Sequence, residues 1–149
     1  ERIPGTRART YDAWIKSSLL EGGAILSHGT DLHIEQGKMI IWGAGGNRMA
    51  IETSNASIVY DAPGLSDGNW HHVAFTLPEN GRVFDFKFYL DGVLLTQEIV
   101  RSNADTFVNT ALGRNVNLGR CHLNSCTLNG AYYFLGAIDE VERATIECC

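Results

Sequence analysis

The stretch Val83-Phe84-Asp85-Phe86-Lys87-Phe88-Tyr89-Leu90-Asp91-Gly92-Val93-Leu94-Leu95 alternates between two kinds of side chain and then reverses direction. One face carries the alternate residues Phe84, Phe86, Phe88 and Leu90. A period of two is that of a β-strand with one buried face. Asp91-Gly92 suits a two-residue type I′ turn. The sequence therefore predicts an antiparallel hairpin of residues 83–90 and 93–95, with the first strand's apolar face in the core.

The rest of the chain shows the same kind of pattern, with short apolar runs between turn residues. The 149 residues include 16 Gly and only 3 Pro, which fits many tight turns. Strands are also expected at residues 10–16, 24–26, 32–35, 38–42, 49–51, 58–60, 71–77, 110–118 and 132–143. About ten short strands predict an all-β fold of two stacked antiparallel sheets. No linker or repeat divides the chain, so residues 1–149 are expected to form a single domain.

Composition excludes several classes of function. Lys plus Arg total 12 and Asp plus Glu total 17, giving a net charge of −5. A mildly acidic chain without a basic stripe is a poor candidate for binding nucleic acid or anionic lipid. No apolar run is long enough for membrane insertion. The chain starts at Glu1 without a signal peptide, so we interpret it as a mature or excised piece of a protein.

The cysteines indicate an oxidising compartment. They are Cys121, Cys126, Cys148 and Cys149, and the sequence leaves all three possible disulfide pairings open. Their spacing does not fit the paired ligands of a zinc site. Asn55-Ala56-Ser57 is an N-glycosylation sequon, although such triplets also arise by chance. Together these features predict a secreted or cell-surface protein.

Four motifs in order resemble the laminin-G-like domains of the concanavalin-A-like lectin/glucanase superfamily. They are Asp67-Gly68-Asn69-Trp70-His71-His72-Val73-Ala74, Phe88-Tyr89-Leu90-Asp91-Gly92, Asn117-Leu118-Gly119 and Phe134-Leu135-Gly136-Ala137-Ile138-Asp139-Glu140-Val141. The opening segment 10–27 is similar as well. The resemblance implies a two-sheet jelly-roll sandwich that serves as an extracellular binding or spacer module.

Two departures from the family pattern bear on assembly. Family members usually carry a further N-terminal strand and usually continue beyond the motif that ends at Val141. A missing strand would leave one sheet edge open, and open edges pair with other chains. Self-association through that edge, or through Cys148 and Cys149, is therefore one hypothesis.

The resemblance also implies a structural calcium ion, for which Asp139 is the candidate ligand. Calcium takes 6–8 oxygen ligands, and part of the family's set comes from the N-terminal segment that is absent here. The alternative is that Asp139 caps a turn or pairs with an arginine.

Catalysis is not expected. Glu140 and Glu142 are predicted to share a strand face, so a glycosidase-like carboxylate pair deserves a test. However, the glucanase signature resembles E-x-D-x-E, and the corresponding run, residues 137–141, lacks both glutamates. No serine, cysteine or phosphate-loop motif is present.

The histidines are expected to be structural. His71 and His72 are adjacent on a strand, so they point to opposite faces and cannot share a metal. His28 and His33 are expected on a loop surface near Asp31.

The ligand-binding candidates are Trp42, Tyr132 and Tyr133. Trp42 borders a glycine-rich stretch and is expected at a rim, and one of the two tyrosines must face away from the core. Most other aromatic residues are expected to be buried or half-buried. The predicted function is a non-catalytic module for recognition or adhesion, with a glycan or an extracellular protein as its partner. The alternatives are a structural subunit of an extracellular assembly and, more remotely, a glycoside-active enzyme.

Overall fold

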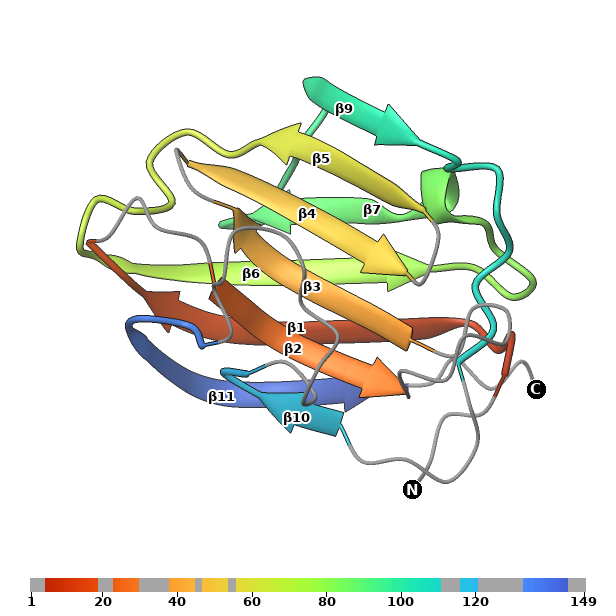
Figure 1. The fold of residues 1–149 in the computed structure, drawn as a ribbon. Helices are drawn as coiled ribbons and strands as arrows, with labels where there is room; N and C mark the ends of the chain where they lie inside the picture. Colours follow the sequence, from red (N-terminus) through yellow and green to blue (C-terminus); the bar gives the residue numbers. More distant parts are fainter. Residues whose placement is uncertain are drawn as a thin grey trace.

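The computed structural model describes residues 5–18, 23–29, 38–44, 47–53, 56–110, 116–120 and 133–144. Within them the chain forms two stacked antiparallel sheets (Figure 1). The strands are β1 (Arg9–Lys16), β2 (Gly23–Gly29), β3 (Lys38–Ala44), β4 (Arg48–Thr53), β5 (Ser57–Asp61), β6 (Trp70–Leu77), β7 (Lys87–Leu90), β8 (Val93–Leu94), β9 (Glu98–Ser102), β10 (Val116–Leu118) and β11 (Ala137–Ala144).

One sheet has five strands in the order β11-β1-β6-β7-β8, and the other has six in the order β10-β2-β3-β4-β5-β9. Strands far apart in the sequence lie side by side in these sheets: β1 pairs with both β6 and β11. This is the all-β sandwich that the strand pattern predicts.

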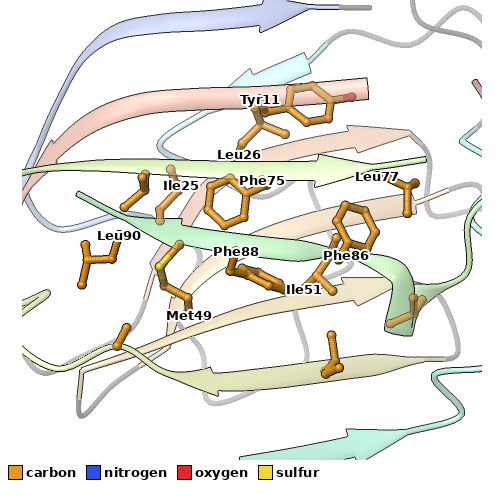
Figure 2. Packing of buried hydrophobic residues seen from close by; sticks show 14 of the residues in the cluster. Tyr11, Ile25, Leu26, Met49, Ile51, Phe75, Leu77, Phe86, Phe88 and Leu90 are labelled. Carbon is orange, nitrogen blue, oxygen red and sulfur yellow. The ribbon is translucent and has the colours of Figure 1, made fainter. Parts of the chain in front are cut away.

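The core lies between the two sheets (Figure 2). Phe88 of β7 is fully buried, and its ring contacts those of Phe75, Phe86 and Tyr60. Met49 and Ile51 of β4 meet these rings from the facing sheet. Tilted and edge-to-face ring pairs of this kind stabilise a core beyond their burial of apolar area.

The predicted strand 83–90 is only partly correct. Its first half is the 3₁₀ turn η1 (Val83–Asp85), and the strand begins at Lys87. The backbone N–H of Arg82 donates to the Asp85 carboxylate (2.8 Å), which favours the turn over an extended chain. The turn rotates Phe84 out of the core, so that 37% of its surface is exposed, whereas Phe86, Phe88 and Leu90 are buried as predicted.

Other boundaries also differ from the predictions. The sequence does not predict strand β9, and the predicted strand 132–143 begins only at Ala137 in the fold. Within the predicted strand 110–118 the structure describes β10 at Val116–Leu118, and residues 111–115 lie outside the described residues. The predicted strand 32–35 lies outside the described residues. His28 is not on a loop surface: it is buried in β2, where its Nδ1 and the Tyr11 hydroxyl lie 3.2 Å apart. His33 and Asp31 lie outside the described residues.

The described part of the chain contains no helix with the length and apolar composition that a membrane crossing requires.

Candidate functional site: the outer tryptophan face

Two tryptophans lie on the outer face of the five-stranded sheet, away from the core. In β1, Tyr11, Ala13 and Ile15 are buried, so the alternate residues point outward. Trp14 pairs with His72 across the β1–β6 ladder, and Lys16 pairs with Trp70. Trp14 and Trp70 remain 38% and 42% exposed. The two side chains thus share one solvent-facing surface, which we call the outer tryptophan face.

A histidine and a carboxylate lie directly beside Trp14. The rings of Trp14 and His72 have centroids 5.5 Å apart and planes tilted by 56°. The His72 Nε2 atom lies 3.5 Å from Oδ1 of Asp12, two residues before Trp14 on β1. These contacts limit the freedom of the indole ring, which lowers the entropic cost of holding a ligand against it.

Strand β11 adds two further carboxylates to the outer tryptophan face. Asp139 is the cross-strand partner of Trp14, and Glu142 is that of Asp12. Cross-strand partners project to the same side of a sheet, with their Cβ atoms about 5 Å apart. The register shifts between these pairs, so two residues of β11 oppose the single residue Ala13.

This bulge corrects the expectation that Glu140 and Glu142 share a face. Glu140 has a φ of 46° and no place in the ladder, whereas Glu142 keeps its partner on β1. The Asp139 carboxylate accepts a hydrogen bond from the Glu140 backbone N–H (2.8 Å), as the turn-capping alternative for Asp139 predicts.

One end of the outer tryptophan face is held by His71, which points to the opposite side of β6 from its neighbour His72, as predicted. His71 Nδ1 lies 2.8 Å from Asp91 Oδ2, and its Nε2 lies 3.0 Å from Asp67 Oδ1. The ring thus joins the turn before Trp70 to the β7–β8 turn.

The charges of this cluster reinforce one another. Burial opposes protonation of His71, but the hydrogen bonds and charges of Asp91 and Asp67 outweigh it and raise the His71 pKa above 6.5. The hydrogen bond from His71 lowers the pKa of Asp67 to about 2, with further bonds from Asn69 acting in the same direction. The turn that precedes Trp70 is therefore fixed by charge–charge attraction at mildly acidic pH, where His71 is protonated and Asp67 is ionised.

Of the residues predicted for ligand binding, only Tyr133 has a described side chain. Trp42 belongs to β3, paired with Ala24 and Ala50, but its side chain lies outside the described residues, as does the whole of Tyr132. Tyr133 is 63% exposed and forms an isolated bridge with Arg120. The predicted disulfide and glycosylation residues Cys121, Cys126, Cys148, Cys149 and Asn55 also lie outside the described residues.

The predicted calcium ligand set is not assembled within the described residues. No group of three His, Cys, Asp or Glu side chains converges there, so Asp139 has no described set of acidic co-ligands. Calcium binding at Asp139 stays a prediction that depends on oxygen atoms from elsewhere in the protein.

Sequence reasoning missed Trp14 and Trp70, although a signal was present. In the segment 10–16, Trp14 falls on the same alternate positions as Asp12 and Lys16, whereas Tyr11 and Ile15 fall on the positions between them. An aromatic residue that alternates in step with charged residues belongs to the solvent face of its strand.

Comparisons with solved structures find the same fold. Domains LG4-5 of the mouse laminin α1 chain match with a TM-score of 0.66 and 14% identity, over 97% of this chain and 37% of that one. A heptameric SAP-like pentraxin from Limulus polyphemus matches with a TM-score of 0.61 and 16% identity, over 95% of this chain and 65% of that one. This chain therefore spans about a third of the laminin structure and two thirds of the pentraxin.

A third similar structure is a carbohydrate-binding module of family 40. It comes from the Ruminococcus gnavus IT-sialidase and was solved bound to α2,3-sialyllactose. Its TM-score is 0.57 and its identity 16%, over 95% of this chain and 79% of the module. A comparison with curated proteins found no match.

The laminin G-type family model matches residues 1–143, nearly the whole chain. This agrees with the sandwich topology and with the motifs of β6, β7 and β11. The chain belongs to the concanavalin A-like lectin/glucanases superfamily, within its laminin G-like branch.

Proposed function

We propose that the chain is a non-catalytic, extracellular glycan-binding module whose ligand lies on the outer tryptophan face. The observation that carries the proposal is the exposure of Trp14 and Trp70 on adjacent strands of a rigid sheet. Large aromatic side chains are ordinarily kept for the core or for an interface, and exposed clusters of them mark binding surfaces.

The chemistry of the face suits sugars. An indole offers a flat apolar surface to the C–H groups of a pyranose ring, and polar side chains beside the indole can bind the hydroxyl groups of the sugar. The carboxylates of Asp12, Asp139 and Glu142 accept hydrogen bonds, which sugar hydroxyls donate. A structurally similar module was solved with α2,3-sialyllactose bound, which supports a glycan as the class of ligand.

A glycan array read with the wild type and with Trp14→Ala tests the proposal. We expect binding to at least one glycan, weakened about 5- to 150-fold by Trp14→Ala. A stacking contact that contributes about 1–3 kcal/mol would have this effect, by analogy with aromatic stacking on nucleobases. Phe107→Ala is the matched control, since Phe107 is a comparably exposed aromatic residue outside the face. Circular dichroism establishes that both variants fold.

Three outcomes would count against this proposal. Wild type that binds no glycan would refute the glycan function. Equal losses in Trp14→Ala and Phe107→Ala would refute the location of the site. A loss confined to Tyr133→Ala would move the site to the tyrosines that follow the cysteine segment.

We propose a non-catalytic role because Glu140 and Glu142, the pair that the sequence suggests, do not lie on one face of β11. The bulge at Glu140 removes that residue from the face that Glu142 shares with Asp12. Glycosidases hold two carboxyl groups across the scissile bond. We expect no hydrolysis of any glycan that the array identifies, measured as reducing ends released over a day.

A specific observation also favours a second function, contact with another protein through β9. All five residues of this edge strand are exposed, including Ile99 and Val100. A groove of about 350 Å³ beside it is lined by Tyr60, Phe84, Asp85, Phe86, Lys87, Leu94, Leu95 and Thr96. Burial and the charge of Glu98 raise the pKa of the Tyr60 phenol that forms one wall.

An exposed edge with apolar side chains can accept a strand from another chain. If β9 mediates such contact between two copies, light scattering of the wild type will give the mass of a dimer, and Val100→Lys will give that of a monomer. A monomeric wild type at 100 μM, well above the concentrations at which most stable dimers form, would exclude β9 as a contact between copies.

A further inference from the structure

We infer that the outer tryptophan face selects glycans by charge, favouring neutral sugars and amino sugars over sialylated or sulfated ones. The inference rests on the proposed function and deepens it by naming the class of ligand. Its basis is the arrangement of charges around the exposed indole of Trp14, which differs from what an acidic sugar requires.

Three acidic residues lie near Trp14, one along its own strand β1 and two on the neighbouring strand β11. Asp12 precedes Trp14 by two residues on the same face of β1, Asp139 lies across the ladder on β11, and Glu142 stands opposite Asp12. All three residues are exposed or half-buried on the same face as Trp14, so their charges act on a ligand stacked against its indole. A sugar carboxylate or sulfate placed there would meet like charges at short range.

The cations described on this face do not cancel that charge. Lys16 lies two residues after Trp14, on the side of Trp70, and Lys87 lies two strands away on β7. His72 contacts Asp12 and adds positive charge only when protonated. Around Trp14 the three carboxylates therefore outweigh the single lysine at neutral pH.

A protonated amine would meet the opposite conditions. The face of an indole attracts cations within about 6 Å of the ring centroid, and the neighbouring carboxylates accept N–H bonds. An amino sugar stacked on Trp14 would use both interactions. The geometry thus points to glucosamine-type residues as the strongest ligands and to neutral hexoses as weaker ones.

The experiment compares sugars that differ in charge on one backbone. The probes are lactose against α2,3-sialyllactose and lactose 3′-sulfate, and N-acetylchitotetraose against its deacetylated glucosamine tetramer. Affinities are measured by calorimetry or biolayer interferometry in 20 mM and 500 mM NaCl. We expect neutral probes to bind at least tenfold better than their acidic counterparts, and the deacetylated tetramer to bind best.

Two further results should accompany this preference. The ratio of the affinities for neutral and acidic probes should shrink in 500 mM NaCl, where the Debye length falls to about 4 Å. It should also shrink in Glu142→Gln, which removes one charge and keeps the shape, but not in the control Asp105→Asn, whose carboxylate pairs with Arg82 away from the face.

The results separate this inference from the proposed function. Acidic probes that bind as tightly as neutral ones, with all binding lost in Trp14→Ala, would refute charge selection and leave the binding face in place. Binding that survives Trp14→Ala, or wild type that binds none of the probes, would refute the face itself and this inference with it.

Discussion

Replacing Phe88 and Phe84 by alanine, one at a time, distinguishes the turn-plus-strand structure of residues 83–90 from a continuous strand. Phe88 is completely buried, with ring centroids at 5.1 Å from Tyr60, 5.3 Å from Phe75 and 6.3 Å from Phe86. Removing a buried phenylalanine ring costs about 3–5 kcal/mol in transfer free energy and cavity formation. Phe88→Ala is therefore expected to lower the free energy of unfolding by that amount.

Phe84 should behave differently because the turn η1 exposes more than a third of it. Its ring has the guanidinium carbons of Arg82 and Arg101 at 6.0 and 5.9 Å from its centroid, both near the surface. Partial burial and two weak cation–π contacts together contribute about 1–2 kcal/mol. The two substitutions should thus differ by about 1–4 kcal/mol, the difference between these two estimates.

Urea denaturation followed by tryptophan fluorescence measures the difference, and thermal melting gives an independent value. For a chain of this length 1 kcal/mol corresponds to about 3 °C, so Phe88→Ala should melt about 9–15 °C below the wild type and Phe84→Ala about 3–6 °C below. Phe88→Leu, which retains most of the volume, should be intermediate. Losses for Phe84→Ala and Phe88→Ala that agree within about 0.5 kcal/mol, the usual error of additivity, would refute the turn and favour a continuous strand.

Three other predictions concern single residues. His71→Gln should destabilise the protein most between about pH 4 and 6.5. Because the His71 pKa is raised, the stability that its charge contributes is complete below pH 6.5 and is lost at higher pH, and the pairing with Asp67 is lost as the pH falls toward 2. A difference in melting temperature between wild type and variant that grows above pH 8 would contradict this. Gly136→Ala should cost about 1–3 kcal/mol, since the new Cβ would overlap the backbone oxygen of Lys16 in β1, and an unchanged melting temperature would disprove the close approach. Arg9→Lys should cost about 1–3 kcal/mol, because the buried Arg9 guanidinium donates to the Thr110 hydroxyl and to two backbone oxygens that one ammonium cannot reach together; wild-type stability in urea would show that these bonds are dispensable.

The sequence predicts most of the sheet framework because strands with one buried face carry a period of two. Strands β1, β6 and β7 each alternate in this way, and the Asp91-Gly92 turn fixes the β7–β8 register. Both turn residues have positive φ, 50° and 80°, as the type I′ turn requires. Local pattern and tertiary fold agree at these places.

The missed features are those where local sequence carries no burial signal or a misleading one. Strand β9 is exposed throughout, so its residues show no alternation between core and solvent. The turn η1 depends on a hydrogen bond from the Arg82 backbone to Asp85, whereas the alternation of Phe84 with Phe86 suggests a strand. Tertiary contacts decide both cases.

The sequence-based candidates and the outer tryptophan face differ because residue type and neighbouring segments guided the first choice, whereas strand pairing guides the second. Trp42 and the pair Tyr132-Tyr133 stand next to glycine-rich or cysteine-rich segments, which suggests a rim. Trp14 instead alternates in step with Asp12 and Lys16 within a regular strand, and only the β1–β6 register brings it beside His72. Cross-strand neighbours depend on pairing, which one strand's sequence does not contain.

The most direct test of the proposed binding face is a chemical-shift titration of ¹⁵N-labelled protein with the tightest-binding glycan of the array. We predict that the largest changes fall on the indole N–H signals of Trp14 and Trp70 and on the backbone amides of Asp12, His72 and Asp139. Changes centred on β9 and the groove beside it, with both indole signals unmoved, would contradict the account and place the ligand at the opposite edge of the sandwich.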